Sequence, residues 1–167
     1  MKKKQSAHLS FTGPGPYYSA IIVAMTVGAV YLSNLDFMQP FKIQALKIPF
    51  IVIGILLLIE GVTLWVSANF KSRLDKHIRN NQLVTTGVYA VVRNPIYTSI
   101  TLACTGVLLF STNALLLILP ILYWAFLTVL LKYTEEKWLA DLYKEEYLQY
   151  KKQVNRCIPW PSRRATK

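Results

Sequence analysis

Three long stretches almost free of charged side chains limit how this chain can fold more than any other feature. Residues 5–35 and 94–131 contain no Lys, Arg, Asp or Glu, and residues 48–70 contain only Glu60. About 20 apolar residues in a helix cross the roughly 30 Å of a bilayer core. With 53% hydrophobic and only 16% charged residues, the chain is poorly suited to a surface in water. The stretches therefore predict an all-α integral membrane protein.

The third stretch is too long for a single span. Its 38 residues would form a helix of about 57 Å, nearly twice the bilayer core. Ser111, Thr112 and Asn113 lie near its middle, and their side chains compete for backbone hydrogen bonds and favour turns. A break there gives about four transmembrane helices, predicted at residues 17–33, 48–70, 95–110 and 114–132.

The basic residues indicate how these spans are oriented. Three lysines precede the first span, five Lys or Arg lie between residues 71 and 93, and nine follow from residue 132 onward, which places 17 of the 19 on one side. The positive-inside rule then puts both termini in the cytoplasm. The first lysines and apolar run resemble a signal peptide, but no small-residue cleavage site follows, so we expect a retained span. The topology and the attraction of basic residues to anionic lipid headgroups explain most of the net charge of +11, so membrane lipids are the expected partners and a nucleic acid is not favoured.

Cysteine and histidine positions argue against a metal or disulfide protein. Cys104 lies inside a predicted span and Cys157 in the tail, with no CxxC pair, and the histidines are only His8 and His77. We therefore expect two unpaired thiols and no metal. The chain also lacks a GxSxG elbow, a Walker loop and a GxGxxG motif, which leaves hydrolase, ATPase and dinucleotide-binding functions without their usual support.

Residues 83–99, LVTTGVYAVVRNPIYTS, carry unusually many polar groups at the edge of an apolar run. A residue before proline avoids the α region, so the chain should stay extended or turned up to Asn94. Pro95 suits the first position of a helix, with Asn94 as its N-cap. The free amides and the positive dipole end of such a helix would suit a polar ligand at the membrane boundary.

The segment after the last span predicts a cytoplasmic amphipathic helix. One apolar and aromatic stripe at helical spacing comprises Leu139, Leu142, Tyr143, Tyr147, Tyr150 and Val154, and such a helix lies on lipid headgroups or packs on the bundle. Glu135 and Glu136 fit this interpretation poorly. They oppose the helix dipole if the span ends at them, and they need a cationic or hydroxyl partner if the helix continues.

Three segments in this order resemble the core of a known family of membrane enzymes. LVTTGVYAVVRNPIY, then EEKWL one hairpin later, then YKEEYLQYKKQVNRCIPW are similar to the isoprenylcysteine carboxyl methyltransferase and phospholipid methyltransferase family. The chain would be a single membrane domain over 1–167, with the first two spans in 1–70, the methyltransferase core in 71–160 and a basic tail in 161–167. The first two spans resemble the family only in hydropathy.

The resemblance implies S-adenosylmethionine as methyl donor at the cytoplasmic end of the last hairpin, and a lipophilic methyl acceptor arriving from the bilayer. Glu135 would accept hydrogen bonds from the cofactor's ribose or amino group, and Arg93 would orient the acceptor or the cofactor's carboxylate, which makes these two the expected catalytic residues. The positions similar to the family's cofactor contacts are Asn81, Gln82, Leu83, Val84, Tyr89, Asn94, Pro95, Ile96, Tyr97, Glu135 and Glu136.

Two positions depart from the family's pattern. Asn94 stands where many members have His, so a titrating ring is missing there although hydrogen bonding survives. Leu131 stands where prenylcysteine enzymes of the animal type carry an Arg for their substrate. Glu60 is an ionisable group at membrane depth and hence a candidate by default; it would either face the site or cap a kink near Gly61.

The expected function is S-adenosylmethionine-dependent methylation of a lipophilic acceptor at the membrane interface, resembling the O-methylation of isoprenylcysteine. N-methylation of a phospholipid or O-methylation of a lipophilic hydroxyl are alternatives within the enzyme class. The alternative from another class is a non-catalytic membrane protein that binds a lipid or a partner.

Overall fold

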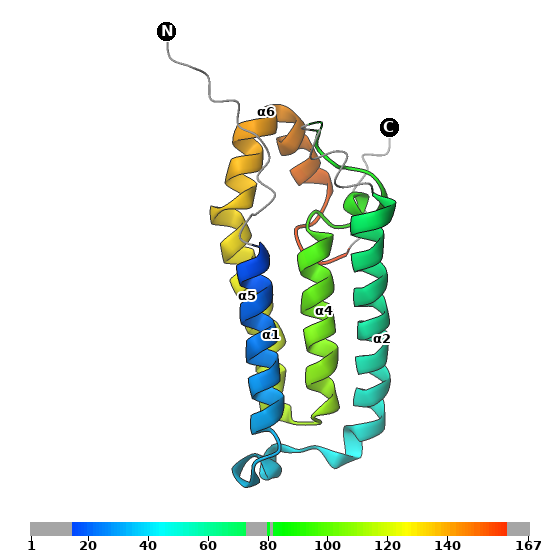
Figure 1. Ribbon diagram of the computed structural model, residues 1–167, viewed down its shortest axis with the longest axis vertical. Helices are drawn as coiled ribbons and strands as arrows, with labels where there is room; N and C mark the ends of the chain where they lie inside the picture. The colour runs from blue at the N-terminus through cyan, green and yellow to red at the C-terminus, as the bar shows by residue number, and fades with distance from the viewer. Residues whose placement is uncertain (1–14, 73–79, 81, 160–167) are drawn as a thin grey trace.

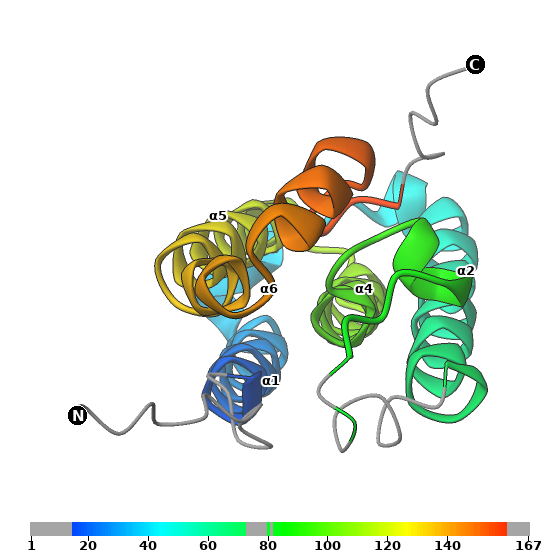
Figure 2. The same cartoon turned by 90° about the horizontal axis from the view of Figure 1, so that it is seen from above.

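The computed structural model describes residues 15–72, 80 and 82–159, and five α-helices account for most of them. Four helices run side by side along the molecule, and α6 lies across one end of this bundle (Figure 1). Seen from that end, α4 stands between α2 on one side and α1 with α5 on the other (Figure 2). The helices are α1 (Gly15–Leu32), α2 (Lys47–Val66), α4 (Pro95–Phe110), α5 (Ile118–Tyr133) and α6 (Glu135–Gln153).

The four predicted spans are confirmed as helices close to their expected bounds. Within the described residues, three helical stretches are long and apolar enough to cross a membrane, namely Gly15–Leu32, Gln44–Lys71 and Ala114–Tyr133, and Pro95–Phe110 is a shorter apolar helix. The predicted break between the last two spans is also present, because Thr112 has a φ of 52° and the Asn113 side chain accepts a hydrogen bond from the Leu115 amide. The all-α, membrane-type fold predicted from the sequence is correct.

Helices α2 and α4 approach each other through glycines. A Cβ atom at Gly106 would lie 2.6 Å from the Gly54 carbonyl oxygen, and one at Gly61 would lie 2.8 Å from the Ser99 carbonyl oxygen. Small residues allow such backbone contact. In lipid, where no hydrophobic driving force acts between helices, this close van der Waals packing stabilises their association. Close contact with α2 thus holds α4, the helix that begins at Asn94–Pro95.

This packing makes Gly106 a sensitive position. We expect Gly106→Leu to push α2 and α4 apart at a cost on the order of 1 to 3 kcal/mol, measured as a lower midpoint of thermal unfolding in detergent. Gly28→Leu is the matched control, because a Cβ atom at Gly28 meets nothing within 4 Å. Equal midpoints for the two variants would show that the α2–α4 contact does not stabilise the bundle.

Buried hydroxyls join α1 to α4 and α5. The Tyr18 hydroxyl lies 2.7 Å from Thr101 Oγ1, and Thr26 Oγ1 lies 2.9 Å from the Tyr123 hydroxyl. The rings of Tyr18 and Tyr123 are almost fully buried among apolar residues. Hydrogen bonds between helices supplement van der Waals packing in a bundle of this kind.

The structure contradicts the kink expected at Glu60. Helix α2 continues through Glu60 without interruption, so no kink needs a cap. Gly61 packs against α4, whereas the adjacent Glu60 side chain is exposed. Successive helical residues point about 100° apart, which explains why the glycine faces α4 and the carboxylate does not.

Helix α6 differs from the predicted helix at two places, its start and a bend within it. Thr134 has φ −118° and ψ −89°, so α5 ends and a new helix begins at Glu135. Lys144 is non-helical, with φ 51° and ψ −126°, and α6 bends there over the end of the bundle (Figure 1). The predicted single stripe is therefore divided between two helical segments. Its buried members still form one cluster around Tyr147 and Tyr150.

Candidate active site

Tyr97 and Glu135 meet where α4 begins and α6 starts. The Tyr97 hydroxyl donates a hydrogen bond to Glu135 Oε1. Tyr97 is in the first turn of α4, and Glu135 is the first residue of α6. Thirty-eight residues separate them in sequence, so the hairpin of α4 and α5 brings the two predicted site residues together.

The break at Thr134 places both glutamates in the first turn of a helix. The span ends at Tyr133, immediately before the glutamates, which agrees with the first of the two sequence-based alternatives, but a separate helix begins at Glu135. Carboxylates in a first turn are stabilised by the positive end of the helix dipole. The expected conflict with the dipole is therefore absent.

The start of α4 agrees with its prediction in backbone but not in side chain. Asn94 is the N-cap residue and Pro95 occupies the first turn, but the Asn94 side chain caps nothing. Instead it donates to the Arg156 carbonyl oxygen, at 3.0 Å. Among the described residues, no acceptor is found for the Ile96 and Tyr97 amides. These two donors beside the Tyr97–Glu135 pair could serve a polar ligand.

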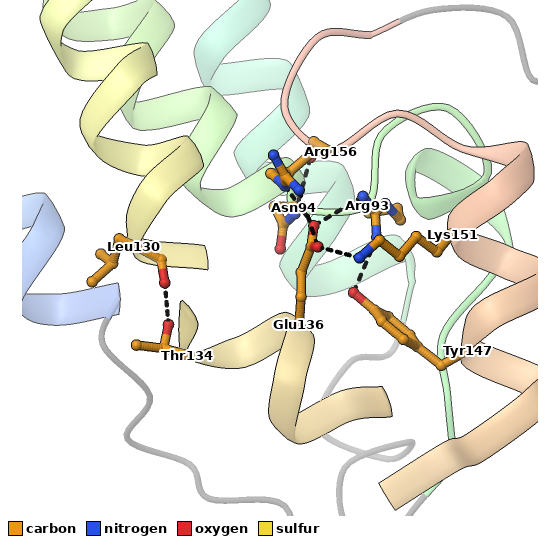
Figure 3. Close-up of polar contacts among 8 residues, drawn as sticks. All are labelled: Arg93, Asn94, Leu130, Thr134, Glu136, Tyr147, Lys151 and Arg156. Carbon is orange, nitrogen blue, oxygen red and sulfur yellow. Dashed lines mark hydrogen bonds and ion pairs between the residues drawn. The ribbon is translucent and has the colours of Figure 1, made fainter. Parts of the chain in front are cut away.

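Glu136 is enclosed by three basic side chains (Figure 3). Arg93 Nη2 lies 2.9 Å from its Oε1, Lys151 Nζ lies 2.8 Å from its Oε2, and Arg156 donates from Nε and Nη2 to the two oxygens. The Glu136 side chain is only 3% exposed. The paired geometry with Arg156 is the strong, bidentate kind. Glu136 thus ties α6 to the loop before α4 and to the C-terminal segment.

The two adjacent carboxyl groups have opposite electrostatic environments. Burial disfavours ionisation of Glu136, but hydrogen bonds from Arg156 and Lys151 and the charge of Arg93 outweigh it and lower the pKa to about 2. Burial raises the pKa of Glu135, and the hydrogen bond from Tyr97 only partly offsets this. Glu136 is therefore a satisfied anion, while Glu135 lacks a cationic partner among the described residues.

Arg93 is held by the same cluster. Its Nη1 donates to the Tyr147 hydroxyl at 3.1 Å, and its guanidinium lies over the Tyr147 ring, 5.9 Å from the centroid. Its Nε is buried with no hydrogen-bond partner in the described part of the chain. Burial raises the pKa of Tyr147 to about 12, although the charge of Arg93 opposes this. Tyr147 thus stays a neutral donor and acceptor beside the arginine.

The loop before α4 supplies the remaining predicted residues. Val84 and Tyr89 are buried together with Ala68, and Ile96 packs against them. Burial, and secondarily the charge of Glu135, raise the pKa of Tyr89, which keeps its hydroxyl protonated. Leu83 packs instead against the Tyr147–Tyr150 cluster. Gln82 is exposed, and Asn81 lies outside the described residues.

Sequence reasoning missed the part of the cluster that comes from the end of α6 and the segment after it. Lys151 and Arg156 pair with Glu136, and the Asn155 and Arg156 carbonyl oxygens accept hydrogen bonds from the Arg93 and Asn94 amides. The predicted packing of Tyr150 on the bundle is present, with its hydroxyl donating to the Tyr89 carbonyl oxygen at 2.6 Å. The three glutamate partners lie 15 to 43 residues away, so helical periodicity could not have found them.

One comparison with known proteins bears on this site. The sequence model of a family described as phospholipid methyltransferase matches residues 45–146, which is more than half of the chain. The match covers α2, α4, α5 and the first part of α6. No curated protein and no solved structure matches the chain.

Proposed function

Because the chain belongs to the phospholipid methyltransferase family, we propose that it transfers a methyl group from S-adenosylmethionine to a membrane lipid. The observation that carries the proposal is the hydrogen bond between Tyr97 and Glu135 at the start of α4. At this end of an apolar helix bundle, a desolvated carboxyl group and a ring hydroxyl lie beside the Ile96 and Tyr97 amides, for which no acceptor is found among the described residues. A charged cofactor and an oily acceptor would meet at such a boundary.

The described residues fit this cofactor. Glu135 would accept hydrogen bonds from its hydroxyl or amino groups, the Ile96 and Tyr97 amides would bind its carboxylate, and the Tyr89 ring would pack on its base. S-adenosylmethionine supplies a methyl group on a cationic sulfur when it is bound. The chain would contribute alignment and the exclusion of water, which matter most when charge disappears in a displacement. Arg93 would contact the acceptor only with guanidinium N–H groups that do not bind Glu136.

For the acceptor we propose a phospholipid headgroup. The cluster at the active site holds three basic side chains and one carboxylate, and its excess positive charge suits a phosphate group. Two of the bases, Lys151 and Arg156, are 41% and 23% exposed and can reach such a ligand. Leu131, where a prenylcysteine enzyme would have an arginine, is fully buried in the apolar core. By the positive-inside rule, this end of the bundle faces the cytoplasm.

Labelled methyl transfer into fractionated membrane lipid tests the proposal. The purified protein in detergent, given S-adenosylmethionine with a radioactive methyl group, should label the phospholipid fraction. Base-labile label on an isoprenylcysteine would instead assign carboxyl O-methylation, and label in a neutral lipid would assign a hydroxyl. If no fraction is labelled and S-adenosylhomocysteine gives no saturable heat in calorimetry, the chain is a non-catalytic membrane protein.

A further inference from the structure

Helix α1 lies outside the part of the chain that the family match covers, yet it contacts the candidate active site. The match begins at residue 45, and α1 ends at Leu32. The first turn of α1 nevertheless lies against Tyr97. A Cβ atom added to Gly15 would lie 2.8 Å from the Tyr97 hydroxyl oxygen and 2.9 Å from Cε1 of its ring. No side chain larger than hydrogen fits between α1 and this ring without moving it.

A second residue of α1 contacts Tyr97 from another direction. The Tyr18 ring stands edge-on to the Tyr97 ring, with centroids 5.9 Å apart and an interplanar angle of 80°. This is a favourable aromatic geometry. Tyr18 is completely buried, so its ring is fixed by its surroundings and offers Tyr97 a rigid neighbour.

A chain of hydrogen bonds reinforces the contact. Thr101 Oγ1 donates to the Tyr97 carbonyl oxygen at 2.9 Å and lies 2.7 Å from the Tyr18 hydroxyl. The Tyr18 hydroxyl also donates to the Tyr123 carbonyl oxygen at 3.3 Å, and either hydroxyl can be the donor between Tyr18 and Thr101. The Tyr18 hydroxyl thus contacts the threonine whose hydroxyl bonds to the Tyr97 carbonyl oxygen.

We propose that α1 is part of the active site, with Gly15 and Tyr18 acting as positioning residues that hold the Tyr97 hydroxyl on Glu135. The proposal deepens the proposed function, since Tyr97 and Glu135 are its expected cofactor residues. It also gives a physical role to a helix that the family match does not cover. The backbone at Gly15, the ring of Tyr18 and the carboxylate of Glu135 together leave Tyr97 one orientation.

The hydrogen bond can be observed without any cofactor. In protein with carbon-13 at the tyrosine Cζ atoms, the resonance missing from Tyr97→Phe belongs to Tyr97, and its chemical shift reports the hydrogen bonding of the hydroxyl. We expect Gly15→Ala to move this resonance. Gly28→Ala, in the same helix but with open space around it, should leave it in place. An unmoved resonance in Gly15→Ala would overturn the proposal, whatever the protein binds.

Binding of S-adenosylhomocysteine gives the functional readout. We expect Gly15→Ala to weaken it about tenfold, the effect of losing one hydrogen bond to a charged group, and Gly28→Ala to change it less than about twofold. The double variant Gly15→Ala/Tyr97→Phe should bind no more weakly than Tyr97→Phe alone, because no hydroxyl remains to be displaced. Full additivity of the two losses would contradict the proposal.

Tyr18→Phe keeps the buried ring, so it tests the proposal even if Gly15→Ala does not fold. It removes only the hydroxyl that bonds to Thr101 and to the Tyr123 carbonyl oxygen, and the Tyr97 resonance should move again, by less than in Gly15→Ala. If Tyr18→Phe and Gly15→Ala both leave the resonance of Tyr97 unchanged, α1 only packs against the bundle. If the two variants move the Tyr97 resonance but the wild-type protein binds no S-adenosylhomocysteine, the positioning role stands and the proposed function fails.

Discussion

Replacing Glu136 with alanine should destabilise the end of the protein where α6, the loop before α4 and the C-terminal segment meet, at a cost on the order of 3 to 5 kcal/mol. Glu136 is 3% exposed and Arg93 is 5% exposed, so the variant would leave a guanidinium buried without its counter-charge. Lys151 and Arg156 would lose the same partner. The expected measurement is a large decrease in the thermal unfolding midpoint in detergent, accompanied by loss of protein during purification.

The partners of Glu136 provide graded controls. Lys151→Ala should cost little, because the Lys151 side chain is 41% exposed and can be replaced by water. Arg93→Ala should cost more than Lys151→Ala, since it also removes the donor to Tyr147 and opens a buried space. If Glu136→Ala unfolds at the same midpoint as Glu135→Ala, the cluster does not hold the helices together and this account of Glu136 is wrong.

The sequence predicted the helices well because each one depends on local composition. Uncharged runs of about 20 residues identify spans by length alone, and Pro95 marks the start of α4 because proline loses nothing in a first turn. Tyr97 and Glu135 could be paired from the sequence only through the family resemblance. Their contact depends on how the hairpin of α4 and α5 folds back, which hydropathy does not specify.

The division of roles between Glu135 and Glu136 could not be predicted. Both are glutamates in one quoted motif, but successive residues of a helix point about 100° apart, and which one meets the cations depends on where α6 begins. Thr134 and Lys144 determine this through backbone angles that their residue types do not favour. The bend at Lys144 returns the chain to Arg93 and brings Arg156 within reach of Glu136. A stripe drawn at helical spacing crosses that bend without detecting it.

Glu135→Ala should have the opposite phenotype, a folded protein that does not bind the cofactor. Its carboxyl group has the Tyr97 hydroxyl as its partner in the described structure, so its removal leaves no buried cation unpaired. Under the proposed function it accepts hydrogen bonds from the cofactor, and charged acceptors of this kind contribute roughly 1.5 to 3 kcal/mol per bond. Two such bonds predict that calorimetry will show S-adenosylhomocysteine binding at least about 100-fold more weakly, with an unchanged unfolding midpoint.

The pH dependence of cofactor binding tests whether the charge of Glu135, and not only its shape, contributes to the affinity. Burial raises the pKa of this carboxyl group above its ordinary value, so it gains a proton at a higher pH than an exposed glutamate would. A protonated carboxyl group is a weaker acceptor, and cofactor affinity in the wild-type protein should therefore decrease as the pH falls through that raised pKa. Glu135→Gln cannot titrate, so its weaker affinity should stay constant over the same range. A wild-type profile as flat as that of Glu135→Gln would mean that the ionised carboxylate does not contact the cofactor, and Tyr97 would then hold Glu135 for structural reasons alone.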